Sequence, residues 1–289
     1  MSYLSAILSP ARLTQIVDVG ANPCEGDPPY KPMLQAGLAD VTGFEPQAAA
    51  LARLNAMKGP RERYLPYALG DGGEHTLHVT AMDGMTSLLE PDAEHLSLFG
   101  RFPEWGTVTA KFPIPTRTLD SISEIAAMDY LKMDIQGAER QVLSHATAKL
   151  KDTVAVQIEV SFISLYKNQP SFGDMDVFMR AQGFLPHCFA EMKTWPLTPT
   201  LMQGKDPMGR QQVLEADMLY VRDFTRAENL SVEQWKHLAM VAHHAYGSYN
   251  LALRSVTMLI KLGALPPGAA MNYVNALKAT KESAPAQNR

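Results

Sequence analysis

The chain has 289 residues and a mass of 31.8 kDa, enough to build its own core as one large domain or two smaller ones. Apolar residues make up 46% and the mean hydropathy is −0.13, which excludes a wholly disordered chain. The net charge is −4. Residues 226–289 carry seven basic and three acidic residues (+4), so residues 1–225 carry −8. An acidic body is a poor electrostatic match for phosphate backbones, which argues against a nucleic-acid substrate.

The cysteine content and the apolar pattern predict a cytoplasmic protein. Two cysteines, Cys24 and Cys188, make neither a disulfide framework nor a zinc site and fit a reducing compartment. The sequence contains no run of about 18 apolar residues, so it predicts no membrane span. The first ten residues lack the basic and long apolar regions of a signal peptide.

Short apolar runs alternate with helix-like stretches from about residue 15 to residue 190. The runs predict strands at 15–19, 41–44, 64–69, 130–134 and 154–159, with helices at 47–57 and 138–150. Pro66 indicates that the third strand is an edge or irregular strand. Strands that alternate with helices predict an α/β fold with a doubly wound, mostly parallel sheet.

Two segments interrupt this alternation. Residues 71–117 are interpreted as an insertion with β character at 75–80, and residues 192–212 as a long polar loop. A final strand is expected at 217–221. We therefore assign residues 1–225 to one domain, which includes the insertion.

Residues 226–289 are expected to form a helical C-terminal unit. Ser231 and Gln234 form a capping-box pattern, and further helices are expected at 250–262 and after residue 268. The first helix presents an apolar face that is too large to leave in water: Trp235, Leu238, Ala242, Ala245 and Tyr249. We expect this face to pack on the body of the protein, with a homodimer as the alternative. The residues from 283 onward are expected to fray.

The first motif that carries chemistry is Val-Asp-Val-Gly-Ala-Asn at 17–22, directly after the first strand. A turn of small residues lets the backbone approach a ligand, and the N–H groups that follow are free to bind it. The next glycine is Gly26, so the Gly-x-Gly-x-x-Gly pattern of dinucleotide folds is absent. An ordinary strand-to-helix turn remains an alternative.

The second motif, Gly-Phe-Glu-Pro at 43–46, places Glu45 at the end of the second strand. A carboxylate at this position can accept two hydrogen bonds from a ribose diol. The third motif, at 131–139, places Asp134 at the carboxyl end of a buried strand, where open α/β sheets bind ligands. Glu139 in the same motif could instead complement the dipole of the helix that follows.

Five ordered motifs resemble the FkbM-type methyltransferases over roughly residues 15–190. They are the three motifs above, Thr-Leu-Asp-Ser at 118–121, and a strand that ends in Glu159-Val160. The resemblance implies the class I methyltransferase Rossmann-like fold and an O-methyltransferase that depends on S-adenosylmethionine. It does not extend to the helical C-terminal unit.

The resemblance also implies roles for single residues. Asp18, Gly20 and Asn22 would line the methionine and sulfonium end of the cofactor, and Glu45 would hold the ribose hydroxyls. Leu69, Gly70 and Asp71 would lie near the adenine, and Asp134 beside the transferring methyl group. The chain has Asp-Ile-Gln-Gly at 134–137 where the family commonly has Asp-Val-Glu-Gly. If that glutamate carries chemistry, Gln136 alters the reaction.

Methyl transfer from a sulfonium is an in-line displacement, so the enzyme must align donor and acceptor. A hydroxyl acceptor also needs a base for its proton, and the candidates are Asp134, Glu159 and His187. Each carboxylate could instead accept hydrogen bonds from the backbone, and His187 could be a packed strand histidine. Phe162, Tyr166 and the segment 83–89 are either walls of the acceptor pocket or loop anchors. The histidine spacings predict no metal site.

The leading hypothesis is therefore an enzyme that methylates a hydroxyl of a sugar or of a small glycosylated metabolite. One alternative is a non-catalytic binding or scaffold protein that keeps the fold and presents its helical tail to a partner. Another is a nicotinamide-dependent oxidoreductase, which the missing second glycine disfavours.

Overall fold

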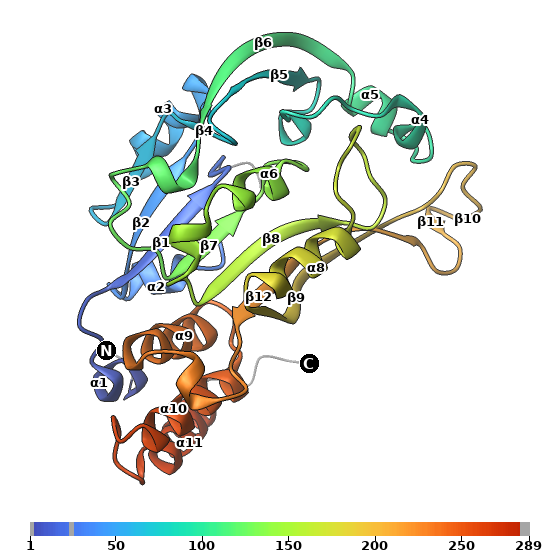
Figure 1. Ribbon diagram of the computed structural model, residues 1–289. Coiled ribbons are helices and arrows are strands. Elements are labelled where there is room, and N and C mark those ends of the chain that lie inside the picture. The colour runs from blue at the N-terminus through green and yellow to red at the C-terminus, as the bar shows by residue number, and fades with distance from the viewer. Residues whose placement is uncertain (1–2, 23–25, 284–289) are drawn as a thin grey trace.

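A computed structural model describes residues 3–22 and 26–283 of the chain, arranged around one central sheet (Figure 1). The order of its seven strands is β3 (Glu62–Leu65), β2 (Ala39–Phe44), β1 (Thr14–Val19), β7 (Tyr130–Met133), β8 (Ala155–Ser161), β12 (Gln212–Arg222) and β9 (Phe184–Trp195). The first five strands are parallel, whereas β12 pairs antiparallel with both β8 and β9. This is the mostly parallel sheet that the sequence predicts.

Helices cover both faces of the sheet because successive strand side chains point to opposite faces. On β1, Ile16 belongs to one apolar layer, whereas Val17 and Val19 belong to the other. The layer of Val17 is covered by α6 (Glu139–Ser144), α7 (Thr147–Leu150) and α8 (Phe172–Ala181). The layer of Ile16 is covered by α1 (Tyr3–Leu8), α2 (Lys31–Gln35), α9 (Val232–His244), α10 (Tyr249–Lys261) and α11 (Ala269–Ser283). Helix α3 (Ala48–Met57) follows β2.

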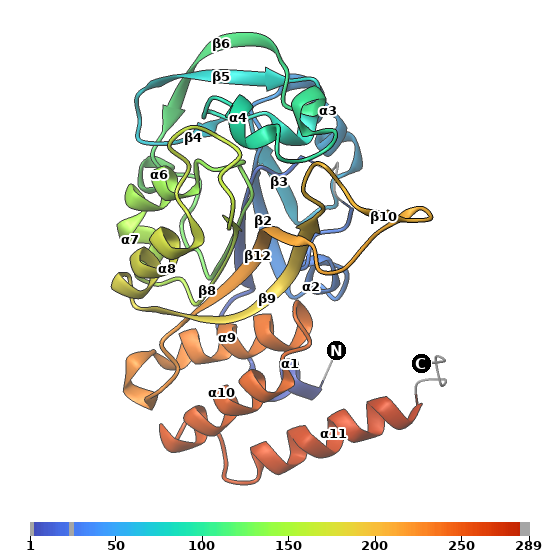
Figure 2. The ribbon, with the colours of Figure 1, turned by 90° about the vertical axis from the view of Figure 1, so that its right-hand side faces the viewer.

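The C-terminal helices share one apolar cluster with the sheet. Trp235 is fully buried, and its indole N–H donates a hydrogen bond to the carbonyl of Ala227 at 2.8 Å. Leu238 and Ala242 of α9 lie in the same cluster as Ile16 of β1, so this part of the expected face packs on the body. Tyr249, also expected on this face, begins α10 instead and is 37% exposed. The capping box of Ser231 and Gln234 is also formed. Figure 2 shows α9, α10 and α11 stacked below the sheet. The division into two domains at residue 225 remains a prediction.

The segment at 71–117 builds a second sheet over the top of the first (Figure 1). The strand β5 (Glu74–Thr80) confirms the β character expected at 75–80, and it pairs antiparallel with β6 (Val108–Arg117). The strand expected at 64–69 is divided at Pro66 into β3 and β4 (Ala68–Leu69), and β4 joins β6 rather than the central sheet. Two short helices complete the segment, α4 (Ala93–Leu96) and α5 (Phe102–Trp105).

Other elements differ from the sequence-based expectation because long-range pairing decides them. Strand β9 continues through Trp195 into the expected loop because it stays paired with β12, where Trp195 lies opposite Gln212. The loop also contains the hairpin of β10 (Met202–Gln203) and β11 (Asp206–Pro207). The helix expected at 138–150 is divided into α6 and α7, and α8 was not expected. Cys24 and residues 284–289 lie outside the described residues. Within the described part of the chain, every helix is too short or too polar to cross a membrane.

Candidate active site

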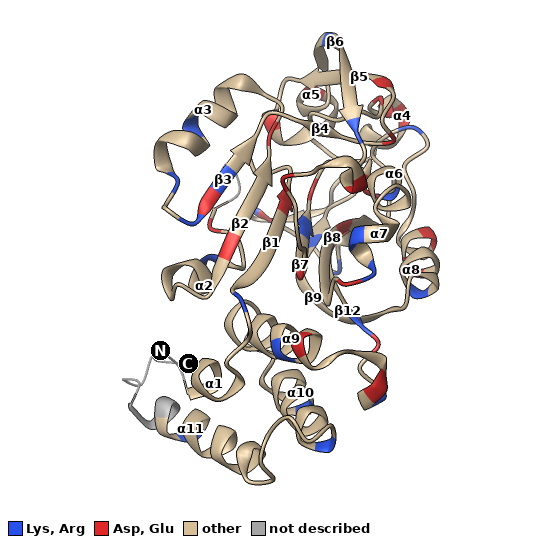
Figure 3. Ribbon diagram, turned by 60° about the vertical axis from the view of Figure 1, so that its left-hand side comes forward, with Lys and Arg blue, Asp and Glu red and all other residues tan. Residues whose placement is uncertain are grey.

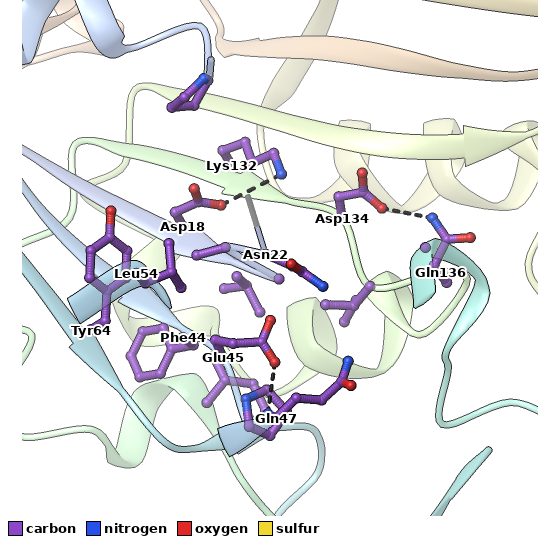
Figure 4. Close-up of a pocket in the computed structure, with 18 of the residues that line it drawn as sticks. Asp18, Asn22, Phe44, Glu45, Gln47, Leu54, Tyr64, Lys132, Asp134 and Gln136 are labelled. Atoms are coloured by element: carbon purple, nitrogen blue, oxygen red, sulfur yellow. Dashed lines mark hydrogen bonds and ion pairs between the residues drawn. The ribbon is translucent and has the colours of Figure 1, made fainter. Parts of the chain in front are cut away.

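A pocket of about 840 Å³ lies at the carboxyl ends of β1, β2 and β7 (Figure 4). Its volume is in the range of about 300–1,000 Å³ that is typical of small-molecule sites. The carboxyl edge of a parallel sheet is where such ligands bind, because the turns between strand and helix diverge there. Six residues that the sequence assigns to the site line this pocket: Asp18, Gly20, Asn22, Glu45, Leu69 and Asp134.

Gly20 allows the turn after β1 to lie against the end of β7. Its φ is +80°, and a Cβ atom at this position would lie 1.9 Å from the backbone oxygen of Asp134. The N–H groups of Gly20 and Ala21 both donate to the carbonyl of Phe44 at 3.2 Å, which ties the turn to the end of β2. Only glycine fits this close approach. The turn therefore holds the ends of three neighbouring strands together under the pocket.

Glu45 is 3% exposed and lies at the end of β2. One carboxylate oxygen accepts a hydrogen bond from the N–H of Gln47 at 2.7 Å, and the other accepts none from the described residues. Burial raises the pKa of Glu45 above its ordinary value, and the hydrogen bond from Gln47 lowers the pKa in part. The carboxylate is thus oriented by the backbone, and one oxygen remains available to a ligand in the pocket.

Asp18 lies in a polar row that crosses the sheet. In the strand register, Asp18 of β1 lies beside Lys132 of β7, and Lys132 lies beside Gln157 of β8. One carboxylate oxygen of Asp18 accepts a hydrogen bond from the hydroxyl of Tyr30. The other oxygen, Oδ1, is buried without a hydrogen-bond partner and lies 3.7 Å from the ammonium of Lys132. Figure 3 shows acidic residues near the upper ends of β1 and β2, and a further acidic residue lower on β2.

The row continues to a carboxylate on β12. The amide of Gln157 donates to Oδ2 of Asp217 at 3.0 Å, and both residues line the pocket. Burial raises the pKa of Asp217 to about 6, and the negative charge of Asp134 contributes to the same shift. The pocket is therefore lined by Asn22 and Glu45, after β1 and β2, and by polar residues of β7, β8 and β12.

Two carboxylates meet at a single amide beside Asp134. The Nε2 atom of Gln136 donates to Oδ1 of Asp134 and to Oε2 of Glu159, each at 3.0 Å. Glu159 is 5% exposed and lies behind the residues that line the pocket. Its other oxygen accepts a hydrogen bond from Lys193, which also binds Glu215. Burial raises the pKa of Glu159 well above its ordinary value, and the charges of Asp134 and Glu215 add to this effect.

The remaining sequence-based candidates lie away from the pocket lining. His187 of β9 is half-buried, and its Nε2 lies 2.7 Å from the hydroxyl of Ser248, while burial lowers its pKa. Asp71 is bound to the ring of His75 and to the N–H of Gly73, and these hydrogen bonds lower the pKa of Asp71. Gly70 packs against Thr116.

The two aromatic candidates for the pocket wall lie outside the lining as well. Phe162 stacks on Phe172, and the hydroxyl of the buried Tyr166 lies 3.0 Å from the carbonyl oxygen of Met85 and 3.0 Å from the side-chain oxygen of Gln136. Both residues therefore anchor loops. The segment 83–89, in contrast, contributes Asp83, Gly84, Thr86, Ser87 and Leu88 to the lining.

Sequence reasoning missed several residues that form the site. Lys132 could have been found, because it lies two residues before Asp134 on one strand and so points to the same face. Tyr30 and Asp217 could not have been found, because the local sequence does not show which strand or turn lies beside them in the folded protein.

The carboxylates of Asp134, Glu139 and Glu159 each have an oxygen within 4.8 Å of the others, a spacing at which acidic groups can hold a cation. In this protein, however, each carboxylate already accepts a protein hydrogen bond, from Gln136, Ile135 and Lys193 respectively. The expectation that the protein has no metal site remains a prediction.

The pocket fits the methyl donor that the sequence motifs imply. The buried Oδ1 of Asp18 accepts no hydrogen bond within the described residues and can accept one from an amino group, and the free oxygen of Glu45 can accept one from a ribose hydroxyl. The two acceptors lie on neighbouring strands at the same edge of the sheet. Both acceptors suit the methyl donor, and they do not indicate which molecule receives the methyl group.

Five parallel strands, an antiparallel pair at one edge, and a ligand pocket at the carboxyl ends of β1 and β2 define a class I methyltransferase. The model of the methyltransferase FkbM domain matches residues 18–186, more than half of the chain. The chain therefore belongs to the FkbM methyltransferase family. The family, the fold class and S-adenosylmethionine as the methyl donor, all predicted by the motifs, are confirmed.

The chain is similar to the 2-O-methyltransferase NoeI of Sinorhizobium fredii (strain NBRC 101917 / NGR234), with 28% identity over 166 residues. The match covers 53% of this chain and 66% of that relative, just under two thirds of its length.

Among solved structures, TrmK of M. capricolum in complex with S-adenosylhomocysteine aligns with a TM-score of 0.35 and 10% identity, over 98% of this chain and 95% of that one. The complex of LepI with SAM aligns with a TM-score of 0.34 and 9% identity, over 76% and 47%. The family assignment rests on the family match and not on these structures.

Proposed function

We propose that this protein is an O-methyltransferase that transfers the methyl group of S-adenosylmethionine to a hydroxyl of a sugar or of a small glycosylated metabolite. The observation that carries the proposal is that one pocket is lined both by Asp18 and Glu45, which suit the donor, and by Asp134 and Asp217, which suit the acceptor. The printed name of the relative NoeI, a 2-O-methyltransferase, supports a hydroxyl acceptor. Carboxylates and amides such as those of Asp217 and Gln157 suit an acceptor with several hydroxyl groups.

In this proposal each residue has a definite task. Asp18 accepts a hydrogen bond from the amino group of the donor, and Glu45 accepts hydrogen bonds from its ribose. The bound donor supplies an electrophilic methyl group on a sulfonium. Asp134 accepts the proton of the acceptor hydroxyl through Oδ2, because Oδ1 is already bound to Gln136. The segment 83–88 and Lys132 complete the walls around the acceptor.

We infer that Glu159 and His187 have tasks other than that of the base. Glu159 lies behind the pocket wall, where it holds Gln136 and Lys193, so we infer a supporting role for it. His187 binds Ser248 at the junction with the helical part, and we infer that it anchors this junction. A cytoplasmic location and a homodimer are also part of the proposal.

Two measurements test this function. Calorimetric titration of S-adenosylhomocysteine should show binding in the parent and a clear loss of affinity in Glu45→Ala. Transfer of labelled methyl from S-adenosylmethionine should then be screened over neutral mono- and oligosaccharides and glycosylated small molecules, with catechol and free amines as acceptors of another class. Binding without transfer to any acceptor favours the alternative of a binding or scaffold protein. Absence of S-adenosylhomocysteine binding contradicts both.

A further inference from the structure

The side chain of Gln136 is held on three sides by other side chains. Its Nε2 carries two hydrogens, and these point to two different carboxylates, Oδ1 of Asp134 and Oε2 of Glu159, each at 3.0 Å. Its Oε1 accepts a hydrogen bond from the hydroxyl of Tyr166 at 3.0 Å. The orientation of the amide is unambiguous, because an amide oxygen turned toward two carboxylates would be repelled by both. Figure 4 shows the bond between Asp134 and Gln136 at the edge of the pocket.

The backbone of Gln136 is held as firmly as its side chain. Its φ is +57°, a left-handed conformation that non-glycine residues rarely adopt. Its carbonyl oxygen accepts a hydrogen bond from the hydroxyl of Ser87 at 2.7 Å. Ser87 lines the pocket and belongs to the segment that forms one pocket wall. Residues held in such a conformation persist where the surroundings over-determine them, and they often cluster at functional sites.

A neutral amide has a specific electrostatic consequence at this position. Asp134 and Glu159 have carboxylate oxygens within 4.8 Å of each other, close enough for strong mutual repulsion. The two N–H groups of Gln136 separate them without the need for a shared proton. A third carboxyl at position 136 would have two acceptors as neighbours in place of two donors, so a proton would have to bind there near neutral pH.

We propose that Gln136 is the positioning residue of the methyl-transfer site: its amide fixes Oδ1 of Asp134 and leaves Oδ2 directed to the acceptor hydroxyl. The inference rests on the proposed function for the identity of the base. The two hydrogen bonds from Gln136 to Asp134 and Glu159, called the clamp below, do not depend on the proposed function. Of the two oxygens of Asp134, Oδ2 accepts no hydrogen bond from the residues that the structure describes, so the available oxygen is the one that the amide does not hold.

The charged and titratable groups that face this amide come from every neighbouring element. They are Asp134 after β7, Glu139 of α6, Glu159 of β8, Tyr166 after β8, Lys193 of β9, and Glu215 and Asp217 of β12. Lys193 is the cation that contacts Glu159 and Glu215. A new carboxyl at position 136 therefore joins a cluster that already contains more acidic than basic groups.

The test compares Gln136→Glu, which keeps the shape and adds a carboxyl, with Gln136→Met, which keeps the length and removes the donors. Urea unfolding at pH 6.0 and pH 8.5 needs no substrate. The unfolding midpoint of Gln136→Glu should lie further below the parent at pH 8.5 than at pH 6.0, because the folded state must release a proton that the unfolded state has already lost. Gln136→Met adds no carboxyl, but it removes the two donors that separate Asp134 from Glu159, so its deficit should also grow with pH, by less than that of Gln136→Glu. Gln35→Glu, on the exposed end of α2, is the matched control, and it should show no pH-dependent deficit.

The second part of the test follows the reaction. In both Gln136 variants the affinity for S-adenosylhomocysteine should stay within about threefold of the parent, whereas kcat with an acceptor from the glycoside screen should fall at least about tenfold. The pH profile of kcat should move in both variants, because each changes the groups that contact Asp134, and it should move further in Gln136→Glu. An unchanged kcat in Gln136→Met overturns the positioning role. A deficit of Gln136→Glu that is equal at both pH values overturns the clamp. If the parent transfers no methyl group, the proposed function fails, while the unfolding comparison still decides whether the clamp exists.

Discussion

The hydroxyl of Tyr246 donates a hydrogen bond to the side-chain oxygen of Gln157 across 2.6 Å. Tyr246 lies just after α9 in the helical part, whereas Gln157 is in the middle of β8 and lines the pocket. The same Gln157 donates from its amide nitrogen to Asp217. The C-terminal helices are therefore connected to the floor of the site by two consecutive hydrogen bonds.

Replacement of Tyr246 by Phe should weaken both the fold and the acceptor site. The change removes the hydroxyl from a buried network that includes Tyr130, which should lower the free energy of unfolding by about 1–2 kcal/mol. The matched control is Tyr273→Phe, which removes a hydroxyl that binds His243 at 2.9 Å far from the pocket. Urea unfolding should show a loss in both variants, but KM for the acceptor should rise only in Tyr246→Phe. An equal effect of the two variants on KM would contradict the connection.

Replacement of Glu45 should weaken cofactor binding with little effect on stability. Each hydrogen bond to a charged group contributes about 1.5–3 kcal/mol, so Glu45→Ala should lose at least about tenfold in affinity for S-adenosylhomocysteine. Glu45→Gln keeps one acceptor oxygen and should lose less. Titration calorimetry measures both values. An affinity in Glu45→Ala equal to that of the parent, in a protein with the parent's circular dichroism, would remove Glu45 from the cofactor site.

Replacement of Asp134 should separate chemistry from binding. Asp134→Asn keeps an acceptor oxygen but cannot take up a proton at neutral pH, so kcat should fall by about a hundredfold or more. The affinity for S-adenosylhomocysteine should change by less than about threefold. Single-turnover assays and calorimetry provide the two numbers. A larger loss in cofactor affinity than in kcat would assign Asp134 to donor binding, and a strongly lowered Tm would make it structural.

The buried Glu139 should make the stability of the protein depend on pH. Burial raises the pKa of Glu139 to about 7, against about 4.3 in an unfolded chain. Below about pH 4.3 the carboxyl is protonated in both states and has no effect. As the pH rises to about 7, the unfolded state releases the proton first, and the folded state loses up to about 3 kcal/mol of stability.

Glu139→Gln removes this loss because glutamine does not titrate, and its oxygen can still accept the hydrogen bond from Ile135. Relative to the parent, this variant should therefore gain stability between pH 5 and pH 8 in urea unfolding. Glu94→Gln, on the exposed start of α4, should show no such gain. A difference between Glu139→Gln and the parent that is constant over this pH range would show that Glu139 is ionised throughout.

Truncation after Thr225 should unfold the protein or make it insoluble. The cut removes Trp235, Leu238 and Leu259, which are fully buried in one cluster with Ile16 and Val41. Each large side chain of this kind contributes about 1.5–3 kcal/mol when buried. Circular dichroism and solubility measure the effect, and a chain that ends at residue 283 is the control. A soluble truncated protein with the parent's Tm would show that the helices form an independent module.

The sequence was sufficient to predict the site residues at the ends of strands. It was insufficient to predict which side chains meet across neighbouring strands. Gly20, Glu45 and Asp134 were found because each directly follows a buried apolar run, and the ends of parallel strands converge. Asp217 was expected only as part of a final strand, since its place opposite Glu159 depends on the register of β12 with β8. A register is set by pairing over the whole sheet, not by local sequence.

The same reason explains the errors among the loops. The segment at 192–212 is rich in proline and glycine, so local patterns favour a loop, yet β9 extends to Trp195 because β12 lies beside it. The candidate base His187 lies on β9, and the pairing of β9 with β12 determines to which face of the sheet His187 points. In contrast, the helix that begins after Ser231 was predicted well because its capping box is entirely local.

The helices that cover the Ile16 face of the sheet also determine when folding can finish during synthesis. All seven strands of the sheet leave the ribosome before α9 and α10, which begin at Val232 and Tyr249. At about 5–20 residues per second, the emergence of residues 223–261 takes on the order of seconds. During that interval Ile16, Val41 and Tyr130 have no helical cover from α9 and α10. The nascent chain thus carries an exposed apolar sheet face, on which chaperones are expected to act until residue 261 has emerged.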